Sequence, residues 1–176
     1  SNIVWNHPQG KELYSLTEFI ELLDITKVTS QGPRFDVVKL DWINGEYIRQ
    51  MSDEKLLGEL QPFIPPDTDE FLIKKLIPLA KERMKHLTDF ALYIKPFTNM
   101  KPIVLPEKYS EYIEPFRSLF TSLSDWNTKT LENVSKKLVT EKGWLLRPAF
   151  MALRLAVTGE KVGLPLFETL EIMGKE

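Results

Sequence analysis

The 176-residue sequence contains no cysteine, which excludes disulfides, cysteine nucleophiles, thiolate zinc sites and iron–sulfur clusters. Its two histidines, His7 and His86, lie far apart and outside any His-Glu-x-x-His spacing, so no metal site is expected. No stretch approaches the roughly 18 consecutive apolar residues of a membrane span, and no basic leader precedes an apolar core. These absences predict a cytoplasmic protein without a membrane partner.

The sequence also lacks the motifs of common enzyme active sites. It has no Gly-x-x-x-x-Gly-Lys-Ser/Thr phosphate loop, no Gly-x-Gly-x-x-Gly fingerprint and no Gly-x-Ser-x-Gly elbow. Adjacent carboxylates such as Asp53 and Glu54 are explained as charge at a helix N-terminus, which the helix dipole favours. The residues therefore predict a module without a catalytic centre of its own.

The composition itself is that of an ordinary globular protein, with 43% apolar residues, 11% aromatic residues and a net charge of −2. A chain of this length buries about 70% of its unfolded surface, so it can fold without a metal or a disulfide. The weak net charge argues mildly against a nucleic-acid partner, but five cations lie within twelve residues. These are Lys74, Lys75, Lys81, Arg83 and Lys85.

Helical patterns dominate, and no strand ladder or repeat is evident. Apolar residues recur at helical spacing, in runs bounded by prolines and glycines. The expected N-caps are Ser15, Asp36, Ser52 and Thr68. Asn44-Gly45 is expected to interrupt one helix, and Pro78 to kink or split another. The expected helices cover about residues 15–24, 36–43, 53–60, 68–87, 107–123, 125–142, 147–157 and 166–173. We therefore predict an all-α fold.

Three prolines between Gln61 and Thr68 mark the best internal boundary, because this segment cannot continue a helix. We place a subdomain junction there, which divides the chain into residues 1–64 and 65–176. A second half of the latter part is expected from about residue 101.

Two functions of different class fit this pattern. A helical scaffold for protein partners would expose an apolar patch, whereas a nucleic-acid module would gather Lys and Arg on one face. Trp42, Trp126 and Trp144 are expected to pack in the core rather than to stack on nucleobases. The pattern alone leaves both functions open.

Residues 35–49 carry a family resemblance. The segment contains Phe35-Asp36, Lys39-Leu40, Trp42-Ile43-Asn44 and Tyr47-Ile48-Arg49. It resembles the part of bacterial-type glutamyl-tRNA synthetases that follows the catalytic fold. Residues 13–20, 82–87 and 153–159 fit the same family, so the resemblance covers essentially the whole chain.

The resemblance implies a fold, a parent activity and a partner. The family consists of class I ligases that use ATP and Mg to join glutamate to tRNA, but their HIGH and KMSKS signatures are absent here. The chain is then a fragment without cofactors and without the catalytic domain. Residues 1–64 would form stem-contact helices, and residues 65–176 a helical cage of the class I synthetase anticodon-binding type. The expected partner is tRNA(Glu), not DNA, and the protein is expected to be monomeric.

The resemblance also implies residues that contact the anticodon. Arg83 matches the family's anticodon-reading arginine, and a planar guanidinium can pair two acceptors on one base edge. The loop before the last helix falls where the family's C-terminal half contacts the anticodon, which implicates Gly163, Leu164 and Leu166.

Five further cations are candidates for contacts with the tRNA backbone. Lys81 and Lys85 flank Arg83 and would bind phosphates, which position the RNA without specifying its sequence. Lys39 and Arg49 are candidates for the tRNA stem, and Arg154 for a structural or phosphate-binding role. The alternative remains a helical protein-interaction module without RNA binding.

Overall fold

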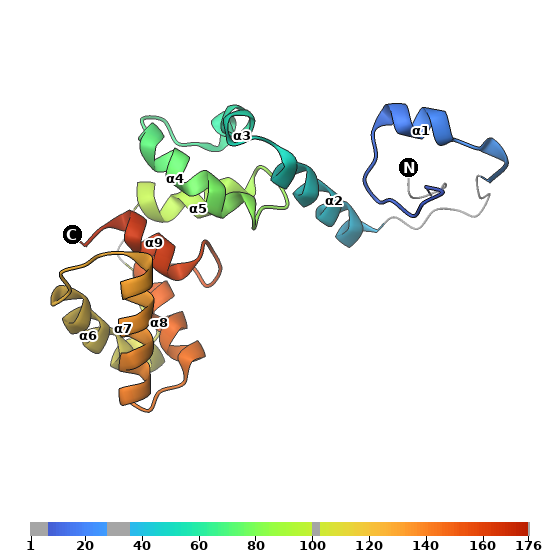
Figure 1. Cartoon of the computed structure of the whole chain (residues 1–176). Helices are drawn as coiled ribbons and strands as arrows, with labels where there is room; N and C mark the ends of the chain where they lie inside the picture. Colours follow the sequence, from blue (N-terminus) through green and yellow to red (C-terminus); the bar gives the residue numbers. More distant parts are fainter. Residues whose placement is uncertain (1–6, 28–35, 100–102, 176) are drawn as a thin grey trace.

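The computed structural model describes residues 7–27, 36–99 and 103–175, and within them all regular structure is helical (Figure 1). The all-α prediction is confirmed. The α-helices are α1 (Leu16–Leu22), α2 (Val37–Gln50), α3 (Asp53–Leu60), α4 (Glu70–Lys81), α5 (Asp89–Thr98), α6 (Ser110–Thr121), α7 (Thr128–Glu141), α8 (Leu146–Thr158) and α9 (Leu166–Met173). Short 3₁₀ turns cover Ile25–Lys27, Gln61–Phe63 and Glu107–Tyr109.

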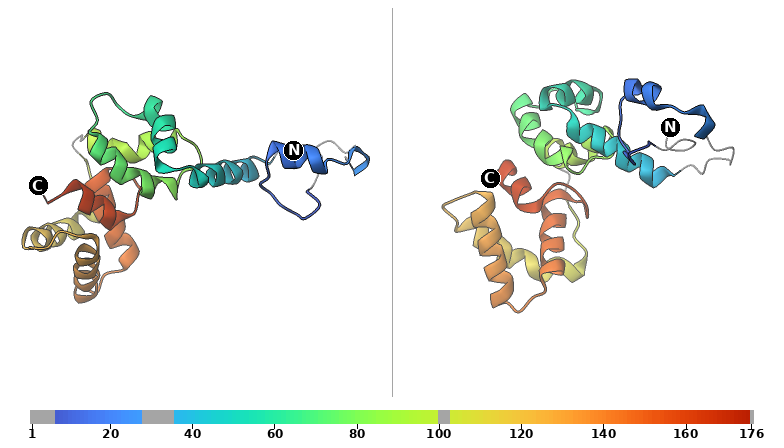
Figure 2. Two further views of the ribbon diagram at one scale, coloured as in Figure 1. Left: turned by 45° about the horizontal axis from the view of Figure 1, so that its top comes forward. Right: turned by 45° about the vertical axis from the view of Figure 1, so that its right-hand side comes forward.

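The helices form an elbow. The α1 segment lies at one end, and α2 leads from it to the cluster of α3, α4 and α5 (Figures 1 and 2). Helices α6, α7 and α8 form the other arm, and α9 lies where the two arms meet. None of the described helices has the length and apolarity needed to cross a membrane.

Four helices begin at a side-chain cap, and three of these caps, Ser15, Asp36 and Ser52, are those that the sequence predicts. In each of four caps a side-chain oxygen accepts a hydrogen bond from the backbone N–H three residues on. These caps are Ser15 (3.0 Å), Asp36 (3.0 Å), Ser52 (3.2 Å) and Asn127 (3.0 Å). The cap expected at Thr68 is wrong: Asp69 Oδ1 accepts from Phe71 N at 3.0 Å, while the Thr68 hydroxyl donates to the Pro65 carbonyl at 2.6 Å.

The helix expected over residues 68–87 ends early. Helix α4 stops at Lys81 and accommodates Pro78 within its length, and residues 82–88 form a turn before α5. The carboxylate of Asp89 stabilises this turn, because its Oδ2 accepts the N–H groups of Lys85 at 2.8 Å and His86 at 2.9 Å. The 82–88 turn, and not a helix, therefore carries Arg83.

Helix α2 is not interrupted at Asn44-Gly45, so that prediction is also wrong. Gly45 is buried, and a Cβ built on it would lie 3.1 Å from the backbone oxygen of Met84. The Asn44 side chain donates its Nδ2 hydrogen bond to the backbone oxygen of Lys85. The Asn-Gly pair permits close packing of α2 against the 82–88 turn instead of ending the helix.

Two hydrophobic clusters form the core, and each of them stabilises one arm of the elbow. The first joins Ile48 of α2 to buried residues of α3, α4 and α5 and to Leu164, and the second joins α6, α7, α8 and α9. The predicted boundary after residue 64 lies inside the sequence range of the first cluster. The assignment of residues 1–64 to the tRNA stem and of residues 65–176 to the anticodon remains a proposal.

The tryptophans differ in their surroundings. Trp126 and Trp144 pack against the second cluster as expected, and the Trp126 Nε1 donates to the Leu170 carbonyl at 2.8 Å. Trp42 is 45% exposed, so the expectation of a core role is wrong there. The reason is that α2 extends away from the α3–α5 cluster (Figure 1).

Candidate nucleic-acid interface

The predicted anticodon residues come from two segments that the fold brings together. Arg83 is exposed on the 82–88 turn, whose backbone is fixed by hydrogen bonds from Arg83 N (2.8 Å) and Met84 N (2.9 Å) to Ala80 O. The Tyr93 hydroxyl of α5 donates to the carbonyl of Arg83 at 3.4 Å. The side chain of Arg83 thus projects from a turn with a defined backbone.

Arg154 of α8 connects this turn to the loop before α9. Its Nη1 donates to the backbone oxygen of Leu164 at 2.7 Å. Burial, followed by the positive charge of Arg83, lowers the pKa of Arg154, although a guanidinium remains protonated at neutral pH. The positive charge of Arg83 therefore acts electrostatically on Arg154. Arg154 in turn holds the loop that contains Gly163 and Leu164.

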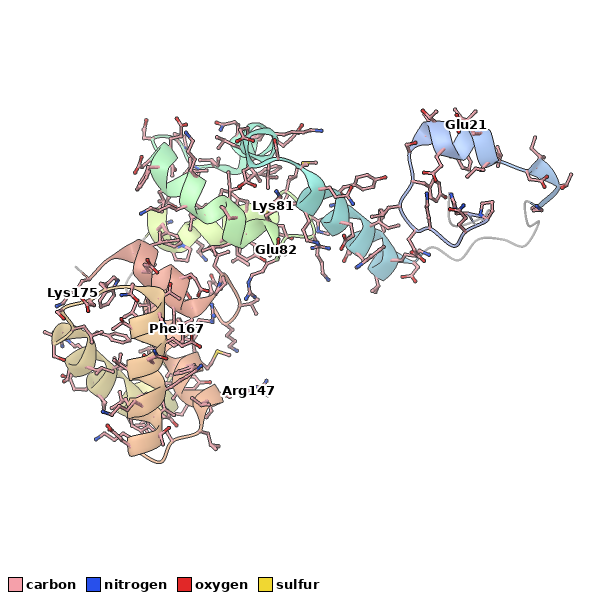
Figure 3. The ribbon with its side chains drawn as sticks, viewed as in Figure 1. Glu21, Lys81, Glu82, Arg147, Phe167 and Lys175 are labelled. Carbon is pink, nitrogen blue, oxygen red and sulfur yellow. The ribbon has the colours of Figure 1, made fainter. Side chains whose placement is uncertain are left out.

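The two segments border an open groove of about 590 Å³, which we call the α8–α9 groove. Arg83, Arg154 and Leu166, all singled out in the sequence, line it. Figure 3 shows Arg147 extending from the start of α8 away from α7. The remaining lining residues are Glu132, Leu146, Arg147, Phe150, Met151, Pro165, Phe167 and Glu168.

The sequence did not point to Arg147, Phe150 and Met151, which also line the groove. One signal for Arg147 was available, since a cation in the first turn of a helix opposes the helix dipole and needs another reason to be there. Phe150 and Met151 gave no comparable signal, because half-buried apolar residues on a helix are indistinguishable by type from core residues.

The loop residues Gly163, Leu164 and Leu166 expose little side-chain surface. Leu164 and Leu166 are only 3% and 7% exposed, and they belong to the first and second clusters respectively. A Cβ on Gly163 would lie 3.6 Å from Arg154 Nη1, in ordinary contact. The two leucines anchor the loop in both arms of the elbow, so their side chains are buried in the core and are not presented to a ligand.

The arginines of the groove differ from most other cations of the described chain in their ion pairing. Among the residues that the structure describes, no carboxylate forms an ion pair with Arg83, Arg147 or Arg154. Of the two acids that line the groove, Glu132 pairs with Lys136 at 2.6 Å, and Glu168 lies in the first turn of α9, where the dipole favours it. The groove therefore presents three cations to a ligand.

Lys81 and Lys85 flank Arg83 but lie in different environments. The Lys81 Nζ lies 2.9 Å from Asp53 Oδ1, and its side chain is only 16% exposed. Lys85 is exposed, and its ammonium forms no ion pair within the described part of the chain. Only Lys85 of this pair has its charge free for a phosphate.

The two cations of α2 are both paired and do not line the groove. The Lys39 Nζ lies 3.0 Å from the carboxylate of Glu12, and Arg49 pairs with Glu46 one turn earlier. The structure therefore separates Lys39 and Arg49 from the groove and joins each to a carboxylate. The described ranges contain no group of three His, Asp or Glu side chains that could hold a metal ion.

Comparison with known proteins defines the family to which this chain belongs. A sequence model of the anticodon binding domain matches residues 55–176, which include α4 through α9 and the whole groove. The chain belongs to the anticodon-binding domain family.

The relatives are glutamate–tRNA ligases, in agreement with the resemblance of residues 35–49. The chain is 31% identical to glutamate–tRNA ligase 1 of Fervidobacterium nodosum and 31% identical to the glutamate–tRNA ligase of Thermus thermophilus. These matches cover 98% and 96% of this chain, but only 37% and 38% of the two ligases. The chain thus spans little more than a third of the length of the relatives it matches.

Solved structures give the same assignment. The chain is similar to a glutamate–tRNA ligase from Elizabethkingia meningosepticum, solved in complex with its amino acid, and to the glutamate–tRNA synthetase of Elizabethkingia anophelis. The TM-score is 0.75 in both cases, at 27% and 28% identity, over 98% of this chain and 36% of each ligase. The prediction of a glutamyl-tRNA synthetase fold of the anticodon-binding type is confirmed.

Proposed function

We propose that this chain binds tRNA(Glu) and recognises its anticodon in the α8–α9 groove. The observation that carries the proposal is the convergence of Arg83, Arg147 and Arg154, none of them ion-paired among the described residues, on one groove of an anticodon-binding domain. Unpaired guanidiniums are suited to RNA, because they bind phosphates and base edges and stack on nucleobases.

Four cations in and beside the groove have separate roles in the proposal. Arg83 donates two hydrogen bonds to the edge of an anticodon base, which a lysine cannot reproduce. Arg154 holds the loop of Gly163, Leu164 and Leu166 against the RNA through the Leu164 carbonyl. Lys85 binds a phosphate, and Lys81 supports the start of the 82–88 turn through Asp53.

The remaining part of the chain contacts the tRNA stem in this proposal. Lys39 and Arg49 would contact the stem backbone, exchanging Glu12 and Glu46 for phosphates. Residues 1–64 then serve the stem, and residues 65–176 serve the anticodon. The same proposal places the chain in a glutamate–tRNA ligase, whose catalytic part uses ATP and Mg to attach glutamate to tRNA(Glu).

A second candidate is a protein-interaction module without RNA binding. It is favoured by exposed apolar residues on α1 and α2, which are Leu16, Ile20, Val38, Leu40 and Trp42. An interface built on these side chains would respond weakly to salt, since it depends on apolar burial and not on phosphate contacts. Salt dependence therefore separates the two candidates.

The experiment is a binding titration with an unmodified tRNA(Glu) transcript and with a transcript whose anticodon bases are changed, each at low and at moderate salt. We expect affinity that falls steeply with salt and is weaker for the changed anticodon. Equal, salt-insensitive affinity for both transcripts, or no binding at low salt, would contradict the proposal.

A further inference from the structure

Helix α2 and the 82–88 turn meet at three points that the anticodon proposal does not use. The Asn44 Nδ2 donates to the Lys85 backbone oxygen, and the Gly45 backbone approaches the Met84 backbone oxygen so closely that a Cβ would lie 3.1 Å from it. The His86 Nε2 lies 3.3 Å from Asp41 Oδ1. These contacts fall on the three consecutive residues that follow Arg83.

The 82–88 turn depends on these contacts for its position. Asp89 fixes the turn internally, and Met84 anchors it in the first cluster with no exposed surface. On the side of α2, the carbonyls of Met84 and Lys85 meet Gly45 and Asn44. Because a guanidinium must reach a base edge with hydrogen-bond geometry, a shift of this turn would misplace Arg83.

We propose that Asn44 and Gly45 are positioning residues for anticodon recognition, and that they hold the 82–88 turn so that Arg83 faces the α8–α9 groove. This inference rests on the proposed function. It assigns a role on the anticodon side to a helix that was otherwise assigned to the tRNA stem. The side chain of Asn44 acts through the Lys85 carbonyl and does not itself touch RNA.

The residue types at both positions suit this role. An aspartate in place of Asn44 would bring a carboxylate oxygen against the Lys85 carbonyl oxygen, so only the amide supplies the required donor. Any side chain at Gly45 would meet a backbone atom, which cannot rotate away as a side chain can. The guanidinium of Arg49 lies 3.3 Å from the same Cβ position and closes the remaining space.

The first test is a double-mutant cycle of Asn44→Ala and Arg83→Ala. The quantity measured is the ratio of affinities for the native and the changed-anticodon transcript of tRNA(Glu). We expect Asn44→Ala to lower this ratio about 2- to 10-fold, and to have no further effect in a chain that already carries Arg83→Ala. Gln61→Ala is the matched control, since it also removes an amide-to-carbonyl bond, from Gln61 Nε2 to Leu57 O at 3.2 Å.

The second test compares Gly45→Ala with Gly58→Ala. Both glycines lie within helices, but a Cβ on Gly58 meets nothing within 4 Å. Alanine favours the helix by about 1 kcal/mol at either position, so helix propensity cannot lower the affinity ratio. We expect Gly45→Ala to lower the affinity ratio and Gly58→Ala to leave it at the wild-type value.

The outcomes separate this inference from the proposed function. If the wild-type chain does not distinguish the two transcripts, both fail. If it does, and Arg83→Ala abolishes the distinction while Asn44→Ala and Gly45→Ala retain it, only the positioning role is overturned. The role is also overturned if Asn44→Ala and Arg83→Ala act additively, or if Gln61→Ala lowers the ratio as much as Asn44→Ala.

Discussion

Lys39 and Arg49 of α2 and Lys81 of α4 differ in their electrostatic surroundings from Arg83 and Arg147 of the α8–α9 groove. Lys39, Arg49 and Lys81 each lie against a carboxylate. Arg83 and Arg147 are exposed at the groove and form no ion pair with any described residue. A paired cation must exchange one anion for another to bind RNA, whereas an unpaired cation gains a partner.

This difference teaches that cation number is a poor guide to an RNA surface. Exposed ion pairs contribute only about 0 to 1 kcal/mol to stability, so the pairs of α2 can be exchanged on binding but offer little net gain. The groove arginines carry charge that the fold leaves uncompensated. We therefore expect the groove to determine specificity and α2 to add weaker, sequence-independent contacts.

The largest effect is expected for Arg154→Met, which removes the hydrogen bond to the Leu164 carbonyl. Loss of a bond from a charged donor should lower the free energy of unfolding by about 1.5 to 3 kcal/mol, measured by urea denaturation. Arg117→Met on the exposed face of α6 is the control and should stay within about 0.5 kcal/mol of wild type. Equal stability of the two variants would show that Arg154 does not hold the loop.

Arg83→Ala tests the unpaired side of the comparison. Because Arg83 is exposed and has no acidic partner among the described residues, its removal should change stability by less than about 0.5 kcal/mol. The same change should cost about 1 to 3 kcal/mol of discrimination between native and changed anticodons. Arg83→Lys should lose most of that discrimination too, since an ammonium lacks the planar fork. Uniform weakening for both transcripts would assign Arg83 to the phosphate backbone.

Lys85→Ala and Lys81→Ala compare two lysines that flank Arg83. Lys81 is ion-paired, whereas Lys85 has no ion-pair partner among the described residues. Loss of a phosphate contact by Lys85 should weaken all transcripts alike and reduce the slope of log affinity against log salt by about 0.7 to 0.9. Lys81→Ala should leave that slope unchanged and lower the unfolding free energy by about 0.5 to 1 kcal/mol, since its partner is Asp53. Equal slopes for both variants would remove the distinction between free and paired lysines.

The smallest effect concerns Glu171, a carboxylate that supports the fold. The hydroxyl and then the N–H of Thr128 donate to it and lower its pKa below the usual 4.5. Its contribution to stability is therefore complete above about pH 4.5 and is lost as the pH falls through the lowered pKa. Glu171→Gln should be slightly less stable at neutral pH and should converge with wild type in acid. A constant difference at all pH values would contradict this linkage.

The sequence predicted the all-α class, the family and three of the helix caps, because apolar spacing and Ser or Asp at a helix start are local signals. It failed where distant packing overrides a local preference. Asn44-Gly45 has the composition of a break, but the amide of Asn44 and the absence of a side chain at Gly45 let α2 contact a turn whose Lys85 lies 41 residues further along the chain. No local signal could indicate that contact.

The candidate site was predictable only in part, because local motifs can be read from the sequence and distant packing cannot. Arg83 and the loop containing Gly163 were found through motif resemblance, whereas Phe150 and Met151 become groove residues only through the crossing of α8 and the loop before α9. Likewise, charge alone could not show that Lys81 points to Asp53 while Lys85 does not. Pairing is a property of the fold, and the sequence gives only the number of charges.

The most direct test of the account is a nucleobase-protection footprint of the tRNA(Glu) transcript bound to the wild-type chain and to Arg83→Ala. We predict that the wild-type chain protects the anticodon bases, and that Arg83→Ala loses this protection while keeping contacts on the stem backbone. Anticodon bases that stay fully reactive in the wild-type complex, or that stay protected by Arg83→Ala, would contradict the claim that the α8–α9 groove recognises the anticodon.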